Sequence, residues 1–278
     1  MRYGKAIKAE TITLIVLGIL VILIFMFPFY IAIAQSFKTQ LETAYDALAL
    51  PGAFRPDNYY EAVEKINFSA SLRNSLIVTV SGVLLIVLCS SMSGYAIARN
   101  EGGYFKVLDR LFLSSIMVPF QVIMIPAYKL LKSLGLLNQL AGEIVMLVGI
   151  SVAYSSFLYV GFVKSIPTEL EDAARIDGCS RIQTFWVIVF PLLKPITATT
   201  AALHAMWLWN DFNISLIVLQ KDAVRTLTIK QFYFFSEYAS DYNMAFAAAI
   251  IGMIPILVTF LFLQKYLVSG ITSGAVKG

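Results

Sequence analysis

The sequence contains little of what a water-soluble enzyme uses to build a catalytic or metal site. Its 278 residues include one histidine and two cysteines, and charged residues make up only 14% of the chain. Cys89 and Cys179 are far apart, which gives neither a disulfide framework nor the spacing of a zinc site. His204 has no partner in an H-E-x-x-H pattern. We therefore expect no metal, no catalytic residue and no bound cofactor.

Motifs that bind phosphate or activate a nucleophile are also missing. The single Gly-Lys pair, Gly4-Lys5, lacks the upstream glycine of a P-loop and is followed by Ala6. No G-x-S-x-G elbow or glycine-rich dinucleotide turn follows a strand pattern. The net charge of +4 is small, and no basic patch with interleaved aromatics is present, which argues against nucleic acid as a partner.

Long apolar runs dominate instead. Hydrophobic residues make up 59% of the chain and the mean hydropathy is +0.77, whereas soluble domains are about 45–50% apolar. A helix needs about 20 apolar residues to cross a bilayer. Six stretches have this length: Thr11–Gln35, Leu72–Ala98, Val107–Leu131, Glu143–Val163, Ile196–Leu219 and Tyr242–Val268. The expected fold class is therefore all-α, a polytopic membrane protein with six transmembrane helices, the fifth interrupted at Trp209–Asp211.

An even number of spans puts both termini on the same side of the membrane. Arg2, Lys5 and Lys8 precede the first apolar run, and cationic residues mark the cytoplasmic end of a span. That run is too long for a signal peptide and lacks a small-residue cleavage site, so we expect it to be retained. Both termini are then cytoplasmic. The expected parts are an N-terminal helix with an external segment (1–70) and a core (71–278) with a cytoplasmic loop (164–195) and a C-terminal tail (269–278).

The cytoplasmic loop begins with the pattern of a short helix near Glu169–Asp177. Thr168 and Glu171 have the spacing of a capping box, in which each side chain bonds to the backbone of the other residue. Acidic side chains fill the first turn, where the helix dipole favours negative charge. Gly178 can adopt the left-handed conformation that ends a helix.

A second helix is expected to start at Arg181, because Ser180 and Gln183 form another capping box. The first helix is about 13 Å long at 1.5 Å per residue, too short to cross a bilayer. It can lie along the membrane surface, and the small side chains of Ala173 and Ala174 permit close approach of another protein.

Polar residues inside the apolar runs are candidates for a translocation path, because intramembrane polar groups tend to face the protein interior. These candidates are Gln121, His204, Asn210 and Asp211. Three of the four have a simpler explanation. Asp211 can lie in water at the outer end of its helix, His204 can be a neutral packing residue, and Gln121 can bond between helices. Cys89 lies in an apolar run and is expected to be buried.

The loop also resembles a known family. Asp172–Ala174, followed by Gly178 and then Ile188–Pro191, is similar to the Glu-Ala-Ala, three residues, Gly, and later Ile-x-Leu-Pro pattern of the membrane subunits of binding-protein-dependent ABC importers. Asp172 replaces the Glu and Phe190 replaces the Leu, but the acidic character is kept. The pattern lies between the fourth and fifth of six expected spans, as it does in that family.

Further similarity points to the carbohydrate branch of the family. Arg73–Leu76, Trp209–Phe212 and the ending Gly270–Gly278 resemble the second permease subunit of maltose-type and related sugar or glycerol-phosphate importers. Ser215 stands where that branch often has proline. The similarity covers almost the whole chain.

The resemblance implies a type I ABC importer permease fold in a bacterial or archaeal cytoplasmic (inner) membrane. It implies a second permease subunit, two ATPase subunits that hydrolyse ATP on separate chains, and an extracytoplasmic solute-binding protein. The residues expected to dock on the ATPase are Glu169, Glu171, Asp172, Ala173, Ala174, Asp177 and Gly178. The tail residues expected to reach the ATPase dimer are Gly274, Lys277 and Gly278.

Other functions are compatible with parts of the pattern. The nearest alternative is an ABC importer permease for a solute other than a sugar. A membrane-embedded enzyme would use Asp211 or His204, although the usual acid–base pairs are absent. A receptor or scaffold is a third possibility. Co-purification of an ATPase chain separates the importer from the last two.

Overall fold

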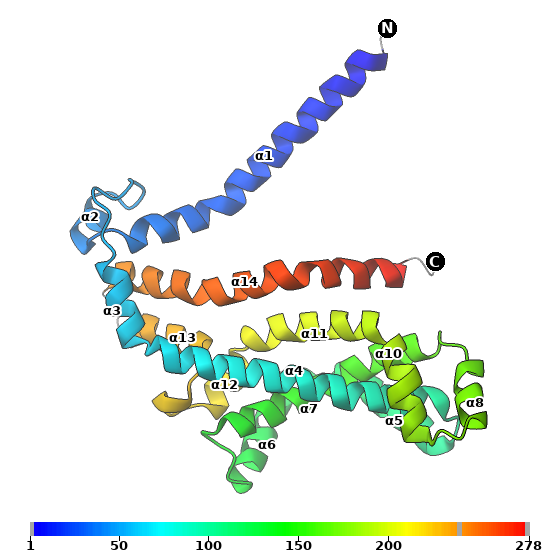
Figure 1. Cartoon of the computed structure of the whole chain (residues 1–278). Helices are drawn as coiled ribbons and strands as arrows, with labels where there is room; N and C mark the ends of the chain where they lie inside the picture. The colour runs from blue at the N-terminus through cyan, green and yellow to red at the C-terminus, as the bar shows by residue number, and fades with distance from the viewer. Residues whose placement is uncertain (1–2, 238–240, 276–278) are drawn as a thin grey trace. The chain divides into compact units, whose positions relative to one another are not determined.

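The computed structural model describes residues 3–237 and 241–275, and every regular element in these two ranges is helical. This confirms the all-α fold class. Figure 1 shows the elements in chain order. They are α1 (Tyr3–Ser36), α2 (Gln40–Tyr45), α3 (Asp57–Lys65), α4 (Phe68–Arg99), α5 (Gly103–Ile116), α6 (Phe120–Ser133), α7 (Leu140–Val163), α8 (Glu169–Ile176), α9 (Arg181–Thr184), the π-helical η1 (Phe185–Val189), α10 (Phe190–Leu192), α11 (Lys194–Trp209), α12 (Asn213–Val218), the 3₁₀-helical η2 (Asp222–Val224), α13 (Leu227–Glu237) and α14 (Tyr242–Ala275).

The chain divides into two compact units. The first contains Met1–Phe68 and Gln231–Ile254, and the second contains Ser69–Lys230 and Pro255–Gly278. The first segment of the chain thus groups with part of α13 and α14, which sequence proximity alone does not suggest.

Four helices are long and apolar enough to cross a membrane, and two bent helix pairs raise the number to as many as six. The four are Glu10–Ser36, Phe68–Arg99, Leu140–Val163 and Tyr242–Phe262. The bent pairs are Gly103–Ile116 with Phe120–Ser133, at 108°, and Arg181–Leu192 with Lys194–Trp209, at 76°. Six spans are reached only if each bent pair counts as one.

The expected third span, Val107–Leu131, is not a single straight helix. The chain instead forms α5 and α6, which meet at 108°. Pro119 caps α6 with extended backbone angles. Proline has no N–H to continue a helix, and it disfavours helical geometry at the preceding residue, Val118. The break therefore has a local cause that was visible in the sequence.

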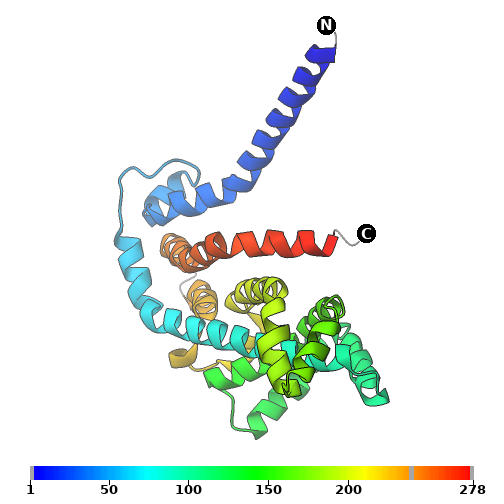
Figure 2. The same cartoon turned by 45° about the vertical axis from the view of Figure 1, so that its right-hand side comes forward.

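The fifth expected span, Ile196–Leu219, is interrupted after Trp209, where the sequence predicts the break. α11 ends at Trp209, and α12 is a separate helix. Asp211 Oδ2 accepts a hydrogen bond from the Ser215 N–H at 2.9 Å. A side chain that takes a backbone donor in this way competes with the helix ladder. At its other end α11 is sharply bent from the preceding helices, and this bend can be followed in Figure 2.

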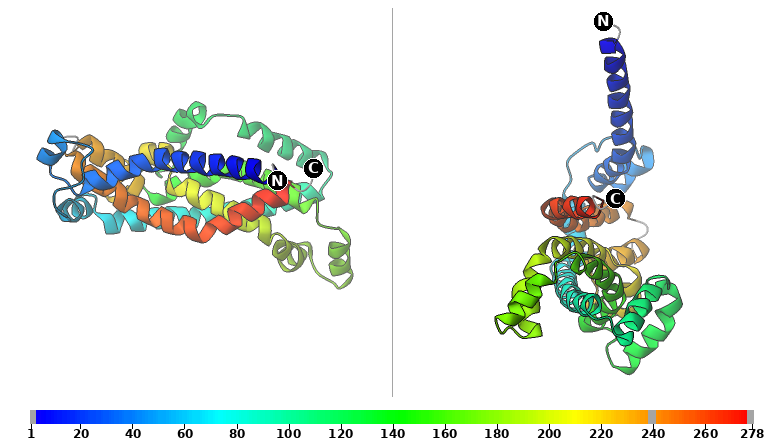
Figure 3. Two further views of the ribbon diagram at one scale, coloured as in Figure 1. Left: turned by 90° about the horizontal axis from the view of Figure 1, so that it is seen from above. Right: turned by 90° about the vertical axis from the view of Figure 1, so that its right-hand side faces the viewer.

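Helices α4, α7 and α11 lie side by side in the second unit, and Figure 3 shows them nearly end-on. A Cβ atom on Gly94 of α4 would lie 2.5 Å from Tyr159 Cβ and 3.1 Å from the Ser156 carbonyl oxygen of α7. Ser93 Oγ is also 2.6 Å from Ser156 Oγ. Only a residue without a side chain allows this approach, and small residues at such positions permit close packing of membrane helices.

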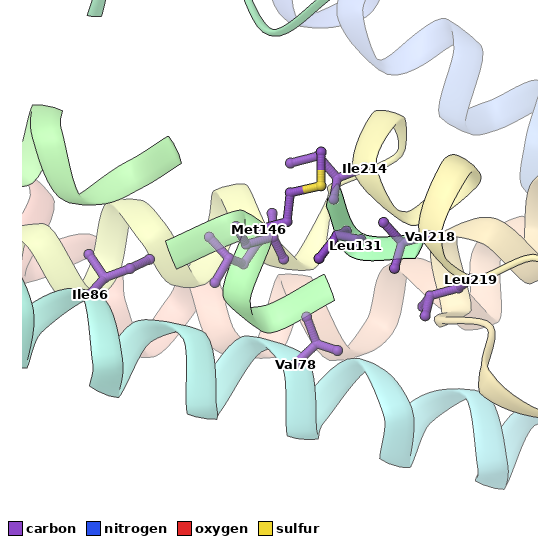
Figure 4. Close-up of a cluster of buried hydrophobic side chains, with 9 residues drawn as sticks. Val78, Ile86, Leu131, Met146, Ile214, Val218 and Leu219 are labelled. Atoms are coloured by element: carbon purple, nitrogen blue, oxygen red, sulfur yellow. The ribbon is translucent and has the colours of Figure 1, made fainter. Parts of the chain in front are cut away.

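The apolar core of the second unit joins helices that are far apart in the sequence. Figure 4 shows its side chains converging from α4, α6, α7 and the α12 region. The buried members are Val78, Ile86, Leu131, Met146, Leu147, Leu208, Ile214, Val218 and Leu219. This cluster holds α12 against α7 and so fixes the link that contains Asp211.

The first unit is held by polar contacts. Asn243 Nδ2 donates to the Gln35 carbonyl at 2.8 Å and to Thr43 Oγ1 at 2.7 Å. Lys38 is buried, and its ammonium donates to the Asp46 carbonyl at 2.9 Å. These bonds satisfy buried polar groups and tie α14 to the segment that follows α1.

Candidate functional site: the α8–α9 loop and the cavity beside α7

The α8–α9 loop (Thr168–Gln183) has most of the local structure that its sequence predicts. α8 runs from Glu169 to Ile176, and Gly178 has φ of 88° in the left-handed region. The Cys179 N–H donates to the Ala174 carbonyl at 2.9 Å and closes the helix end. The predicted helix, its glycine stop and the start of the next helix at Arg181 are all confirmed.

Of the two predicted capping boxes, only the second forms. The Ser180 N–H donates to Gln183 Oε1 at 2.8 Å, and the Gln183 N–H donates to Ser180 Oγ at 3.3 Å. The first box is wrong, because the Thr168 side chain makes no capping hydrogen bond. Thr168 has helical backbone angles, so its carbonyl oxygen and not its hydroxyl accepts the Glu171 N–H, at 2.9 Å. The Glu171 carboxylate, which should bond back to Thr168, points elsewhere.

Glu171 is buried and binds the end of α4. Its side chain is 2% exposed, and Oε1 lies 2.7 Å from Arg99 Nε. Oε2 accepts a hydrogen bond from the Tyr95 hydroxyl at 2.8 Å. Arg99 also donates through Nη2 to the Ile166 carbonyl at 2.8 Å. The guanidinium therefore joins α4 both to α8 and to the turn that precedes it.

The side of α8 that faces away from Glu171 is exposed and partly apolar. Leu170 is 44% exposed and Ile176 is 87% exposed, with Ala173 exposed between them. Residues spaced by three lie on neighbouring positions of a helix face. Large exposed apolar side chains in such a group are typical of a protein interaction surface. Leu170 and Ile176 are not among the residues predicted to dock, although the spacing Leu170, Ala173, Ile176 was the signal for them.

The seven expected docking residues divide between the two faces. Glu171 and Ala174 are buried against the rest of the chain, whereas the other five are exposed: Glu169, Asp172, Ala173, Asp177 and Gly178. Asp172 pairs with Arg175 on the surface at 3.0 Å.

A cavity of about 100 Å³ lies at the junction of α6, α7, α11 and α12. Its lining residues are Phe120, Leu147, Ile150, Ser151, Trp207, Leu208, Asp211, Asn213 and Ile214. Ser151 is about 18 Å along α7 from Val163, where the chain leaves the span toward α8, at 1.5 Å per residue. The cavity and the α8–α9 loop are therefore at different levels of the same helix bundle.

Of the four expected path residues, Asp211 alone is among the lining residues of this cavity. Gln121 is exposed next to Phe120. Asn210 is exposed and donates to the Met206 carbonyl at 2.8 Å. His204 is buried on α11, with Nε2 2.6 Å from Ser155 Oγ of α7.

A buried acidic group close to this region was not predicted as a site residue. Glu143 of α7 is 1% exposed and accepts a hydrogen bond from the Ser215 hydroxyl, while the Ser215 N–H donates to Asp211. Ser215 thus links two carboxyl groups from different segments. An acidic residue at the start of a span was the available signal.

Two further expectations concern Cys89 and the C-terminal tail. Cys89 is exposed on α4, so the prediction of a buried thiol is wrong. The side chain lies on the outer surface of an apolar helix rather than between helices. Gly274 belongs to the last turn of α14, whereas Lys277 and Gly278 lie outside the described residues.

Four to six candidate spans, a short helix tied to one of them by a buried ion pair, and a cavity between the helices are the features of a polytopic membrane protein. The chain belongs to the family of binding-protein-dependent transport system inner membrane components, whose model matches residues 86–273. It is therefore a membrane transport subunit and not an enzyme.

The chain is 38% identical to the probable starch degradation products transport system permease protein AmyC of Thermoanaerobacterium thermosulfurigenes, over 98% of this chain and 99% of that protein. It is 36% identical to the melibiose/raffinose/stachyose import permease protein MelC of Bacillus subtilis, over the full length of both. A chain of a bacterial ABC transporter involved in the import of the acidic polysaccharide alginate has the same fold, with a TM-score of 0.77, 23% identity, and coverage of 93% of this chain and 96% of that one. The fold is the type I ABC importer permease fold.

Proposed function

We infer that this chain is one of two permease subunits of an ATP-driven importer whose cargo is an oligosaccharide or a related sugar. Relatives that match nearly the whole chain are named as permeases for starch degradation products and for melibiose, raffinose and stachyose. Full-length similarity supports a shared type of cargo. The second permease subunit would complete the translocation path.

The exposed face of α8 is the observation that carries this proposal, because it offers a surface for an ATPase subunit. Leu170, Ala173 and Ile176 are exposed on α8, and the charged side chains of Glu169 and Asp172 are exposed on the same short helix. An ATPase chain that covers this face would remove the apolar side chains from water. The buried residues Glu171 and Ala174 would support the face from behind.

In this arrangement both termini and the α8–α9 loop lie in the cytoplasm, with one ATPase subunit docked on each permease. An extracytoplasmic binding protein would deliver the sugar on the opposite side. The family description refers to binding-protein-dependent transport. A neighbouring structure of the same fold is described as an alginate transporter in complex with a periplasmic protein bound to a pentasaccharide.

The path for the sugar would include the cavity that Asp211 lines. His204 would contribute as a buried support of α11, through its contact with Ser155. Gln121 and Asn210 would contribute from exposed positions. The C-terminal residues Gly274, Lys277 and Gly278 would contact the ATPase dimer.

Co-purification tests the docking surface. This chain is co-expressed with its second permease and ATPase, and the ATPase retained on an affinity-tagged permease is measured in detergent. Ile176→Asp and Asp172→Lys are expected to reduce retention several-fold. The matched control is Thr168→Ala, which removes an exposed side chain without a capping bond. Retention equal to that of the control would contradict docking through α8.

Uptake assays distinguish a sugar permease from a permease for another solute. Cells that carry the whole importer should accumulate a labelled oligosaccharide in an ATP-dependent manner. Accumulation of a peptide or an inorganic ion, and of no sugar, would favour the alternative of a permease for another solute.

A further inference from the structure

The cavity beside α7 combines aromatic and polar side chains in a way that suits a sugar ring. Phe120 and Trp207 supply aromatic groups, and Ser151, Asp211 and Asn213 supply polar atoms. The remaining lining residues are aliphatic. Binding sites for small molecules are mostly apolar, with a few polar groups that fix orientation.

Neighbouring side chains hold the indole ring of Trp207 in position for stacking. Its ring is stacked on that of His204, with centroids 5.7 Å apart and an angle of 21° between the planes. Ser155 Oγ lies 2.6 Å from His204 Nε2, so a hydrogen bond from α7 holds the imidazole in place. Trp207 itself is 56% exposed, and it is not needed to fill the core. One face of the indole is thus backed by His204, which leaves the other for the apolar C–H face of a sugar ring.

Asp211 supplies the selectivity of the cavity. It is half-buried, and its Oδ2 is held at 2.9 Å by the Ser215 N–H. A carboxylate accepts hydrogen bonds from sugar hydroxyls, and charge-assisted bonds of this kind are the stronger ones. The same carboxylate repels a ligand that carries its own carboxylate. The lining residues include this acid and no lysine or arginine that would neutralise an acidic sugar.

The size of the cavity limits its contents to part of one sugar ring, so the rest of an oligosaccharide would lie outside it. An apolar cavity of about 150 Å³ takes a benzene molecule. A space of about 100 Å³ beside an exposed aromatic group therefore holds part of one pyranose and not a longer chain.

We propose that this cavity is a subsite for one ring of a neutral oligosaccharide, in which Trp207 stacks on the ring, Asp211 and Asn213 bond its hydroxyls, and Asp211 excludes acidic sugars. This proposal rests on the proposed function as a sugar permease. It adds that the chain itself contacts the cargo and selects it by charge.

Calorimetry on the complete importer, without its binding protein, tests the subsite. The probes are raffinose and maltotriose as neutral sugars and tri-galacturonate as the acidic one. Wild type is expected to bind at least one neutral probe at least tenfold more tightly than tri-galacturonate. Trp207→Ala should weaken neutral binding about tenfold, and Trp207→Phe should restore part of it. Asp211→Asn should narrow the preference for neutral over acidic probes.

The matched control is Gln220→Ala, which removes an exposed amide side chain shortly after α12 that does not line the cavity. It should bind all three probes as wild type does. The proposal is overturned if no probe binds the wild type, if tri-galacturonate binds it as tightly as the neutral probes, or if both Asp211→Asn and Trp207→Ala leave binding unchanged.

Uptake driven by the binding protein is measured on the same preparations in vesicles. ATP-dependent uptake of a neutral sugar together with an unchanged probe profile in the variants would refute the subsite and leave the importer function intact. Absence of ATP-dependent uptake of any sugar would refute the proposed function itself.

Discussion

Arg99 at the end of α4 and Glu171 in α8 are 72 positions apart in the sequence, yet Nε and Oε1 lie 2.7 Å from each other. Glu171 is also bonded to Tyr95, and Arg99 is bonded to the Ile166 carbonyl. A short helix outside the membrane has little packing of its own. The buried ion pair therefore ties α8 to the end of α4, which is one of the candidate membrane spans.

The first prediction concerns this ion pair. Arg99→Ala leaves the buried Glu171 carboxylate without its cation, and removal of one partner of a buried pair costs about 3–5 kcal/mol. We expect a lower unfolding temperature in detergent and loss of transport-coupled ATP hydrolysis. Arg175→Ala is the control, because its pair with Asp172 is solvent-exposed and such pairs contribute about 0–1 kcal/mol. Equal unfolding temperatures for the two variants would refute the anchoring role.

The second prediction concerns the turn after α8. Neither Gly178 nor Gly161 has an atom within 4 Å of an added Cβ, but only Gly178 of the two has positive φ, at 88°. Gly178→Ala should therefore destabilise the loop by about 1–2 kcal/mol, the cost of the left-handed conformation for a side chain with Cβ. Gly161→Ala should be neutral or slightly stabilising.

The second measurement on variants at Gly178 is the amount of sugar taken up per ATP hydrolysed. Gly178→Val, with a β-branched side chain, should hydrolyse ATP without proportionate sugar uptake, because the docking helix is no longer held at its C-terminal end. Tight coupling in Gly178→Val would show that the left-handed turn has no part in docking.

The third prediction concerns packing between α4 and α7. Gly94→Ala places a methyl group against Tyr159 and the Ser156 carbonyl, and overpacking of this kind costs about 1–3 kcal/mol. Thermal unfolding in detergent should show a clear decrease relative to wild type. Gly149→Ala in α7 meets no atom within 4 Å and serves as the control. A Gly94→Ala protein as stable as the control would mean that the two helices do not pack this closely.

The fourth prediction concerns topology. Cys179 is partly exposed in the α8–α9 loop, and we expect a membrane-impermeant thiol reagent to modify it only from the cytoplasmic side. The experiment uses a Cys89→Ser background, since Cys89 is exposed on α4. Mass spectrometry of intact cells and of inverted vesicles gives the labelled fraction. Modification of Cys179 in intact cells would reverse the proposed orientation.

The fifth prediction concerns the C-terminal tail. Deletion of Gly274–Gly278 should lower sugar uptake or its coupling to ATP hydrolysis, while the amount of membrane-inserted protein stays at the wild-type level. Lys277→Ala removes the charge of the tail but keeps its backbone, and so tests the contribution of the charge alone. Full sugar uptake by the truncated protein would refute the proposed contact between the tail and the ATPase dimer.

The features that the sequence predicted correctly depend on residues close together in the chain. Four of the six apolar runs form single helices that are long and apolar enough to cross a membrane, because length and composition are local properties of the chain. Gly178 stops α8 because of its own backbone freedom, and Ser180 caps α9 by bonding three residues ahead. The break at Pro119 is also local, and it was overlooked although proline marks it.

Tertiary structure decided the features for which two segments must meet. Glu171 forms no capping box, because Arg99 competes for its carboxylate from 72 residues away. Gly94 is a contact point and Gly161 is not, although both are glycines in apolar helices. Trp207 and Asp211 line a cavity because α6, α7, α11 and α12 converge there. Local patterns specify helices and turns through short-range sterics and hydrogen bonds, but the direction in which a side chain faces depends on what packs against it.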